Sequence, residues 1–204
     1  DTPPVLLTGF NRRFSPPAMG IHKAVRDRAS PMMMNYRVNA GYLPPDMWVH
    51  GAEGGGRNLG EACHFYDLFV YLTGSRPSEV QALSLRPQSA YYRRDDNFSV
   101  TVSFEDGSVA TLTYTALGAK DYPKERLDVY VDGKVFALDN FTSVQPFGTR
   151  DGAFSASRAD KGHAEQWAAF TKAIRLGGDW PSPLWQQMSA MQIAFDVQRQ
   201  IVGS

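Results

Sequence analysis

The spacing of hydrophobic residues changes along the chain, and this change predicts the order of the elements. From Asn58 to Thr73 apolar residues recur every three or four positions, which is typical of a helix with one buried face. Over residues 80–138 apolar and polar residues alternate instead, as they do in strands covered on one side. Helical spacing returns over 162–176 and 183–202. The pattern therefore predicts a block of strands between helical segments.

The strand block is expected to form a sheet of neighbouring, mostly antiparallel strands. The predicted strands are 80–85, 98–104, 109–115, 126–131 and 135–138, with 141–147 as a further candidate. The Asp-Gly pairs at 106–107 and 132–133 predict tight hairpin turns. We therefore expect an α+β fold in which an open, mostly antiparallel sheet carries helices on one face.

Further elements are expected at both ends of the chain. Val5–Gly9 has the pattern of a buried strand of the parallel type, and Met32–Ala40 that of a second strand. Ser15 before two prolines predicts the start of a helix that reaches Ala29. The two C-terminal helices are expected to bury their largest apolar side chains, namely Trp167, Phe170 and Ile174 in the first, and Trp185, Met188, Met191, Ile193 and Phe195 in the second.

Composition excludes several classes of protein. The 204 residues suffice for one core and include 21 basic and 21 acidic side chains. This balance argues against a nucleic-acid or anionic-membrane surface, and no apolar run reaches the length of a membrane span. The single cysteine, Cys63, leaves nothing for an internal disulfide, which suits a reducing cytoplasm.

One segment carries candidate chemistry. Gly54, Gly55 and Gly56 end a long loop, Gly41–Gly56, and precede the helix on which Glu61, His64 and Asp67 follow at spacings of three. Two carboxylates on the same helix face as a histidine favour its charged form, so we expect the pKa of His64 to be raised. The alternative is that the two acids only solvate the helix while the histidine packs on the sheet. No metal is expected, because adjacent helical residues such as 63 and 64 point about 100° apart.

Two motifs resemble those of the Gfo/Idh/MocA family of NAD(P)-dependent oxidoreductases. They are Gly9-Phe-Asn-Arg-Arg-Phe14 and Gly54-Gly-Gly-x₇-His64-x-x-Asp67. The resemblance implies a Rossmann domain followed by an open-sheet domain of the dihydrodipicolinate-reductase type, of which this chain would hold only the second. Residues 1–29 would be a remnant at the exit of the missing Rossmann domain, and residues 30–204 the substrate-binding and oligomerisation domain. NAD or NADP would bind mainly to the missing domain, and no cofactor to this chain alone.

A longer match narrows the resemblance. The segments Tyr36–Gly41, Gly54–Arg57 and Gly60–Phe65 look similar to a branch fused to zinc-dependent, alcohol-dehydrogenase-like domains and linked to sugar metabolism. The implied substrate is a hydroxyl of a sugar, polyol or sugar nucleotide, oxidised with hydride transfer to nicotinamide. A cytoplasmic homo-oligomer that associates through the sheet face is also implied.

The resemblance implies a role for each candidate residue. His64 would exchange a proton with the substrate hydroxyl, and Asp67 would orient the helix. Many members have an aspartate four residues before the histidine; here that position is Gly60, so Glu61 would take over or the proton relay would be altered. The second outcome would suit a different function, a non-catalytic scaffold or ligand-binding module of the same fold.

The substrate would contact side chains outside the helix motif. The candidates are Arg12, Tyr36, Asn39, Trp48 and Arg57. Three of them have structural alternatives: a surface ion pair for Arg12, a loop anchor for Trp48, and pairing with Glu53 for Arg57.

Overall fold

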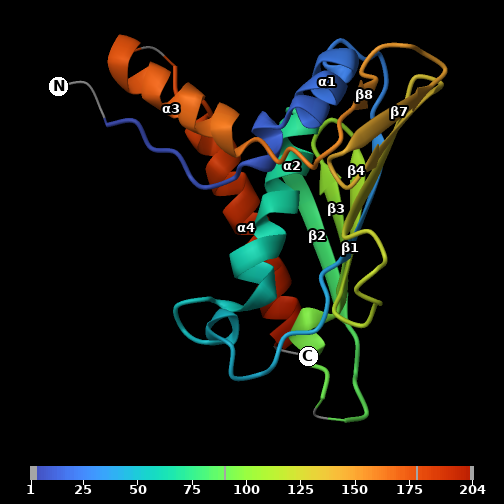
Figure 1. The fold of residues 1–204 in the computed structure, drawn as a ribbon, viewed down its shortest axis with the longest axis vertical. Helices are drawn as coiled ribbons and strands as arrows, with labels where there is room; N and C mark the ends of the chain where they lie inside the picture. Colours follow the sequence, from blue (N-terminus) through green and yellow to red (C-terminus); the bar gives the residue numbers. More distant parts are fainter. Residues whose placement is uncertain (1–3, 90, 178, 203–204) are drawn as a thin grey trace.

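The computed structural model describes residues 4–89, 91–177 and 179–202 and has two layers (Figure 1). In the described residues, one sheet of eight strands has the order β2-β3-β4-β1-β5-β6-β7-β8. The strands are β1 (Met33–Asn39), β2 (Pro77–Ser84), β3 (Phe98–Phe104), β4 (Val109–Thr115), β5 (Glu125–Val131), β6 (Lys134–Asp139), β7 (Ser143–Phe147) and β8 (Phe154–Ser155). β1 pairs with β4 in parallel, and the other neighbouring pairs are antiparallel. This confirms the predicted α+β class.

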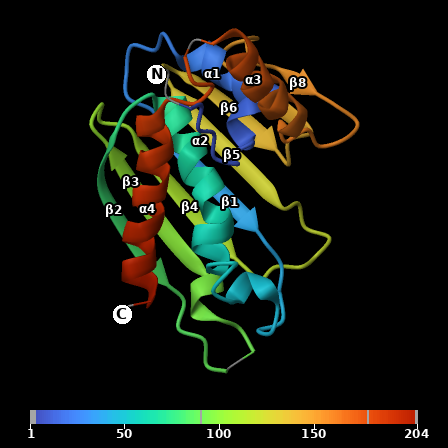
Figure 2. The ribbon, with the colours of Figure 1, turned by 90° about the vertical axis from the view of Figure 1, so that its left-hand side faces the viewer.

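The helices lie on one side of the sheet (Figures 1 and 2). They are α1 (Pro16–Val25), α2 (Cys63–Thr73), α3 (His163–Leu176) and α4 (Leu184–Val202), and shorter turns include η1 (Arg12–Phe14), η2 (Trp48–His50) and η3 (Asn58–Ala62). α2 and α4 lie side by side across the strands. The core is the space between these helices and the alternate strand residues that face them.

Side chains alternate across the sheet as the sequence pattern predicts. Phe98, Val100 and Val102 of β3 are buried under the helices. On the opposite side, Ser99 and Thr101 face outward, and no helix covers that side of the described sheet. The open face is largely polar, whereas the covered face is apolar, because only the latter is removed from water.

Several predicted boundaries are confirmed by local chemistry. Asp132 and Gly133 both have positive φ, 49° and 71°, as a tight turn between two antiparallel strands requires. Ser15 accepts a hydrogen bond from the backbone N–H of Ala18 and begins α1. That helix ends at Val25, four residues earlier than predicted, and Gly74 with φ 64° ends α2 as expected.

The prediction of a strand at Val5–Gly9 is wrong. The segment is irregular, and side chains satisfy its backbone groups in place of a neighbouring strand. The Thr8 N–H donates to Oε1 of Gln187 at 2.8 Å, and Gln166 Nε2 donates to the Thr8 carbonyl at 2.9 Å. The segment lies against α3 and α4 (Figure 1), and in the described residues it pairs with no strand of the sheet.

The predicted apolar faces of the last two helices are also partly wrong. Trp167 of α3 is 65% exposed, and Met188 of α4 is 63% exposed. In α4 the buried row is Ala190, Ile193, Ala194, Val197 and Ile201, so the prediction is confirmed for Ile193. α4 packs on α2 and β2; Trp185 and Met191 lie partly buried against the core, whereas Met188 and Phe195 are exposed.

A buried ion pair joins the N-terminal segment to α2. Arg13 donates from Nε and Nη2 to both oxygens of Asp67, at 2.8 and 2.5 Å, and its Nη1 donates to Gln186 of α4 at 2.6 Å. The Asp67 side chain is fully buried. Burial raises the pKa of Asp67, and the guanidinium opposes that rise. The charges are tolerated because each is hydrogen-bonded to the other.

We expect Arg13→Met to lower the free energy of unfolding by about 3–5 kcal/mol, since it leaves the Asp67 carboxylate buried without its counterion. Urea unfolding at pH 7 measures the change. The matched control is Arg26→Met, which removes an exposed pair with Asp27 and should cost no more than about 1 kcal/mol. Equal effects of the two substitutions would contradict this account.

Candidate functional site

The loop before α2 is shaped by glycines. A Cβ at Gly54 would lie 2.4 Å from the Val49 carbonyl oxygen, and Gly55 and Gly56 have φ of 67° and 78°. Gly60 is packed in the same way, since a Cβ there would lie 2.6 Å from the carbonyl oxygen of Gly54. An aspartate at position 60 would therefore require this loop to move, which is a physical reason for a carboxylate at position 61 instead.

His64 lies in the first turn of α2. Its ring packs edge-to-face on Phe10, with 5.6 Å between ring centroids, and the residue is partly exposed. Its Nδ1 is buried and has no hydrogen-bond partner among the described residues. The imidazole is therefore neither sealed in the core nor fully solvated.

A cluster of charged and hydroxyl groups surrounds Glu61, one turn before His64. Lys124 Nζ lies 2.6 Å from Oε1 of Glu61, the Tyr114 hydroxyl donates to Oε2, and Arg57 Nε lies 3.8 Å from Oε2. Burial alone would raise the pKa of Glu61, but Lys124, Tyr114 and Arg57 lower it below its usual value. We call these four residues the Glu61 cluster.

A second cluster of the same composition surrounds Glu125, the first residue of β5. Arg12 donates from Nε and Nη2 at 2.8 and 3.0 Å, the Tyr36 hydroxyl donates at 2.8 Å, and Lys161 Nζ donates at 2.5 Å. Burial would raise the pKa of Glu125, but Arg12 and Lys161 lower it to about 2. We call these residues the Glu125 cluster.

The two clusters meet at Phe65, the neighbour of His64 in the chain. The Phe65 ring centroid lies 4.8 Å from that of Tyr36 and 6.4 Å from that of Tyr114. The guanidinium carbon of Arg12 lies 4.6 Å above the same ring. Side chains of both clusters therefore pack near this ring, which belongs to the residue next to His64 in the chain.

The expected rise in the pKa of His64 is wrong. Burial lowers its pKa, Arg12 lowers it further, and the opposing effects of Glu61 and Glu125 leave it at about 4. Both carboxylates are already paired with cations, so they stabilise an imidazolium at His64 only weakly. In the described residues no hydrogen bond joins Glu61 to His64, and Asp67 is occupied by Arg13.

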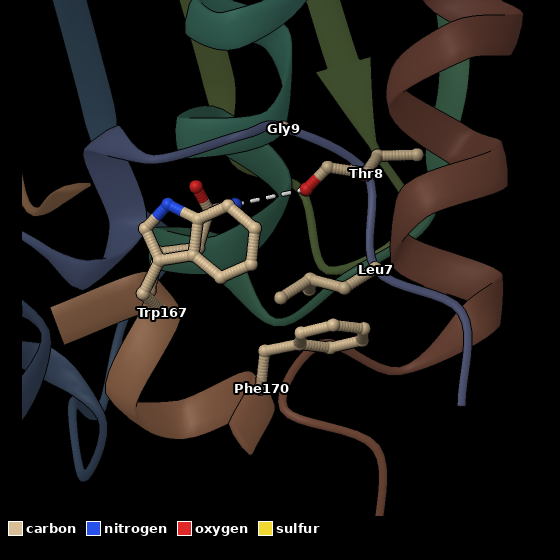
Figure 3. Close-up of a pocket in the computed structure, with 6 residues that line it drawn as sticks. Leu7, Thr8, Gly9, Trp167 and Phe170 are labelled. Atoms are coloured by element: carbon tan, nitrogen blue, oxygen red, sulfur yellow. Dashed lines mark hydrogen bonds between the residues drawn. The ribbon is translucent and has the colours of Figure 1, made fainter. Parts of the chain in front are cut away.

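A polar groove opens beside the Glu61 cluster, at the ends of β1 and β5. Its volume is about 750 Å³. Lys124 lines it, and so do Asn39, Lys120, Asp121, Tyr122, Asp139, Asn140 and Thr142. A smaller, mostly apolar cavity of about 140 Å³ lies between the N-terminal segment and α3, where Leu7, Trp167 and Phe170 converge (Figure 3).

The predicted substrate-binding residues lie in different surroundings. Arg12 and Tyr36 are 6% and 2% exposed and bound to Glu125, so they stand behind the site and do not form a surface that a ligand could touch. Asn39 lines the groove, and its amide donates to the carbonyls of Ala119 and Tyr122. The surface ion pair considered for Arg12 is likewise wrong, because the pair is buried.

The other two candidates lie in and after the glycine-rich loop. Arg57 is buried; it donates to the Gly41 carbonyl at 3.0 Å and faces Glu61 in place of the considered partner Glu53. Trp48 is 67% exposed on η2.

The sequence analysis missed Glu125, Lys124, Lys161 and Tyr114. Lys124 and Glu125 stand just before or at the start of a strand, and Tyr114 is one inward position among many. The only signal for Glu125 in the sequence is the alternation of apolar and polar residues along β5, which places its carboxylate on the apolar face of that strand. No local pattern marks Lys161, because only a tertiary contact brings it to the site. The next residue, Gly162, has φ 79° and lets the chain approach Ser15 so closely that a Cβ at position 162 would lie 2.3 Å from the Ser15 nitrogen.

Two kinds of feature are not found in the described residues. They contain no strand–turn–helix unit with a G-x-G-x-x-G turn, since Val5–Gly9 is irregular. In the same residues no three His, Cys, Asp or Glu side chains are grouped as metal ligands, and burial raises the pKa of Cys63 to about 12. No helix among them is long and apolar enough to span a membrane.

Solved structures with a similar fold are larger than this chain. UDP-N-acetylglucosamine 3-dehydrogenase GnnA from Acidithiobacillus ferrooxidans superimposes with a TM-score of 0.76 at 19% identity, over 98% of this chain and 62% of its own. Aldose-aldose oxidoreductase from Caulobacter crescentus, solved with glycerol, gives a TM-score of 0.78 at 16% identity, over 97% and 62%. At these identities the likeness concerns the fold.

Sequence comparison adds a family. Inositol 2-dehydrogenase of Rhizobium meliloti (strain 1021) is 26% identical over 192 residues, which are 88% of this chain and 57% of that protein. The chain thus spans just over half the length of this relative. Residues 30–136, more than half of the chain, match the family described as GFO/IDH/MocA C-terminal domain. The chain therefore belongs to the GFO/IDH/MocA family and contains its C-terminal domain.

Proposed function

We propose that this chain is the substrate-binding half of an NAD(P)-dependent oxidoreductase acting on a hydroxyl of a sugar, polyol or sugar nucleotide. The observation that carries the proposal is a partly exposed imidazole, His64, on the motif helix of a GFO/IDH/MocA domain, close enough to Glu61 and Glu125 for both carboxylates to act on it electrostatically. The relatives named for inositol and for UDP-N-acetylglucosamine support a polyhydroxylated substrate.

In this proposal the chain handles the proton of the substrate hydroxyl. Oxidation of an alcohol to a carbonyl removes a hydride from carbon and a proton from oxygen. The hydride acceptor is proposed to bind to a domain that this sequence does not include, with residues 1–29 leading from it into residues 30–204. His64 takes the proton. Glu61 contributes to this proton transfer through Lys124 and Tyr114, to which it is bound.

With its pKa lowered to about 4, the His64 imidazole is neutral at neutral pH, the form that accepts a proton, although it is a weaker base than an ordinary histidine. Arg12 has a positioning role: its buried guanidinium disfavours the imidazolium and lets the proton leave again.

Association between subunits is proposed to use the open face of the sheet. That face carries alternate strand residues such as Thr111 and Thr113, so the contact would be polar and hydrated. A cytoplasmic location is proposed on the same basis as in the sequence analysis, the single unpaired cysteine.

The first test is His64→Gln in the intact enzyme. Loss of the proton acceptor should lower kcat/KM by about 10²–10⁴-fold, the usual contribution of general acid–base catalysis. Steady-state oxidation of inositol and of other polyols measures the change. His22→Gln on α1 is the control, since this histidine stacks on Tyr71 outside the two clusters. Full turnover in a folded His64→Gln protein would exclude the role, and would favour a non-catalytic module.

The second test concerns pH. The pKa of His64 in the folded chain, about 4, is below its ordinary value of 6.5, so the folded state binds fewer protons between these values. The stability that this pKa shift contributes is fully present above about pH 6.5 and is lost as the pH falls through 4. The total loss in the free energy of unfolding is roughly 3 kcal/mol. Urea unfolding at pH 7, 5.5 and 4 should show this loss in the wild type but not in His64→Gln. A wild type that gained stability relative to the variant at low pH would indicate a raised pKa.

The third test is cofactor binding by the chain alone. Titration calorimetry with NAD and with NADP should show no binding at micromolar concentrations, because the sequence contains no G-x-G-x-x-G turn to hold the pyrophosphate. Catalytic inactivity of the isolated chain follows. A clear micromolar affinity for either nucleotide would contradict the assignment of cofactor binding to another domain.

A further inference from the structure

Buried polar atoms without a hydrogen-bond partner gather at one place in the described residues. They are Nδ1 and Nε2 of His50, Oδ1 of Asp96 and Nε of Arg57. Buried polar groups in proteins are nearly always hydrogen-bonded, because an unpaired one loses its contacts with water and gains nothing in return. Three such residues together therefore need an explanation, and the proton transfer assigned to His64 does not supply one.

His50 belongs to the long loop 41–56, which precedes the motif helix. The backbone hydrogen bonds within this loop join near neighbours: the His50 N–H donates to the Met47 carbonyl at 2.9 Å, and the Gly55 N–H to the Gly51 carbonyl at 3.0 Å. Glycines with positive φ stand at its two ends, 74° at Gly41 and 67° at Gly55. Because glycine rotates easily about its backbone bonds, the loop can move as a unit about these ends.

Two side chains of the loop reach the segment that precedes β3. Tyr42 stacks on Tyr91, with 4.3 Å between ring centroids, and Tyr91 is 55% exposed. His50 faces Asp96, the last residue of the short turn η4 (Arg94–Asp96), with 3.7 Å between Nε2 and Oδ2. These two side chains are only 2% and 4% exposed. Since charges interact more strongly away from water, the force between His50 and Asp96 depends strongly on whether both are charged.

The Asp96 side of this contact is fixed to the sheet. The next residue, Asn97, accepts hydrogen bonds at its Oδ1 from the Thr115 hydroxyl and from the Ala116 N–H, both at 2.9 Å. The Asn97 amide also donates to the Arg93 carbonyl at 2.8 Å. Asp96 is therefore a stationary anchor, and the loop that carries His50 is the part that moves.

The other cations near Asp96 are already engaged. Arg57 acts on it, but this guanidinium also faces Glu61, with 3.8 Å between Nε and Oε2. Arg93 acts on it too, but is paired with the neighbouring carboxylate at 2.7 Å. The His50 imidazole is therefore the partner whose gain or loss of a proton changes the balance of charge at Asp96.

The pair carries opposite charges only within a window of pH. Burial raises the pKa of Asp96 and Asp95 adds to the rise, while His50, Arg57 and Arg93 oppose it. Tyr114 of β4 faces the same carboxylate, since its own raised pKa is due to burial and in part to Asp96. Attraction is lost on the acid side when Asp96 takes up a proton, and on the alkaline side when His50 gives one up.

We propose that His50 and Asp96 form a proton-dependent latch that holds the loop 41–56 as one wall of the polar groove, and that loss of either charge releases the loop. Release moves Gly41, Tyr42 and Leu43, which line the groove, so the latch controls how widely the groove opens. The unpaired atoms fit this role, because 3.7 Å is only about 0.5–1 Å longer than a hydrogen bond and a small shift of the loop pairs them. The inference does not depend on the catalytic role of His64.

Hydrogen exchange in the full chain tests the latch. The reporters are the amides of His50, Gly51 and Gly55, whose hydrogen bonds lie within the loop. Their protection, corrected for the intrinsic pH dependence of exchange, should fall about tenfold as the His50 ring loses its proton, followed by NMR in the same sample. The amide signal of Leu43, on the groove wall, should shift with the same midpoint.

Variants assign the effect to the pair. Asp96→Asn and His50→Gln should each lower the protection of the three amides about tenfold at the pH where the wild type is most protected, and the double variant should lose no more than either single one. Asp95→Asn is the matched control: its carboxylate pairs with Arg93, so the loop amides should keep their protection. Unchanged protection of Val102 in β3 shows that each variant is folded.

Three results would overturn the latch: full protection of the loop amides in Asp96→Asn, the same loss in Asp95→Asn, or protection in the wild type that ignores the titration of His50. The last measurement needs no variant, so it decides the matter even where a substitution prevents folding. These outcomes are separate from the test of His64→Gln, because no substrate or turnover enters them.

Discussion

The rest of the site depends on one buried carboxylate. Glu125 has no exposed surface, yet it stays ionised because Arg12, Lys161 and Tyr36 all donate to it. These partners come from η1, from the segment before α3 and from β1, which are far apart in the chain. A single charge that would be unstable alone therefore fixes three segments on β5. The position of His64 follows, because Phe10 and Arg12 belong to the segment that is tied down.

The same constraint explains why two adjacent arginines have different roles. Arg12 and Arg13 both lie in the short η1 turn, and the turn directs one guanidinium to Glu125 on the sheet and the other to Asp67 on α2. The Arg13 pair holds the helix layer together, whereas the Arg12 pair sets the electrostatic environment of the imidazole. Gly162 makes this possible, since only a residue without a side chain lets the chain before α3 approach the turn so closely.

The electrostatics of His64 show why counting charges along a helix is insufficient. Glu61 and Asp67 flank it in the sequence, and on an isolated helix they would favour the imidazolium. In the folded chain Asp67 forms an ion pair with Arg13, and Glu61 forms one with Lys124. Both cations come from other elements. Burial and Arg12 then determine the sign of the pKa shift. The sequence contains all of these residues but not their pairing.

Local rules were sufficient wherever a few consecutive residues decide the outcome. The alternation over β3 and β4, the positive φ at Asp132 and Gly133, the cap at Ser15 and the glycine end of α2 depend only on neighbours in the chain, so the fold class and the motif helix could be predicted. Only the tertiary structure decided that Val5–Gly9 is not a strand, that α4 leaves Met188 and Phe195 exposed, and that Lys124 pairs with Glu61 and Lys161 with Glu125. The physical reason is that burial and charge pairing depend on distances in space between segments more than 100 residues apart, as in the pair Arg12–Glu125.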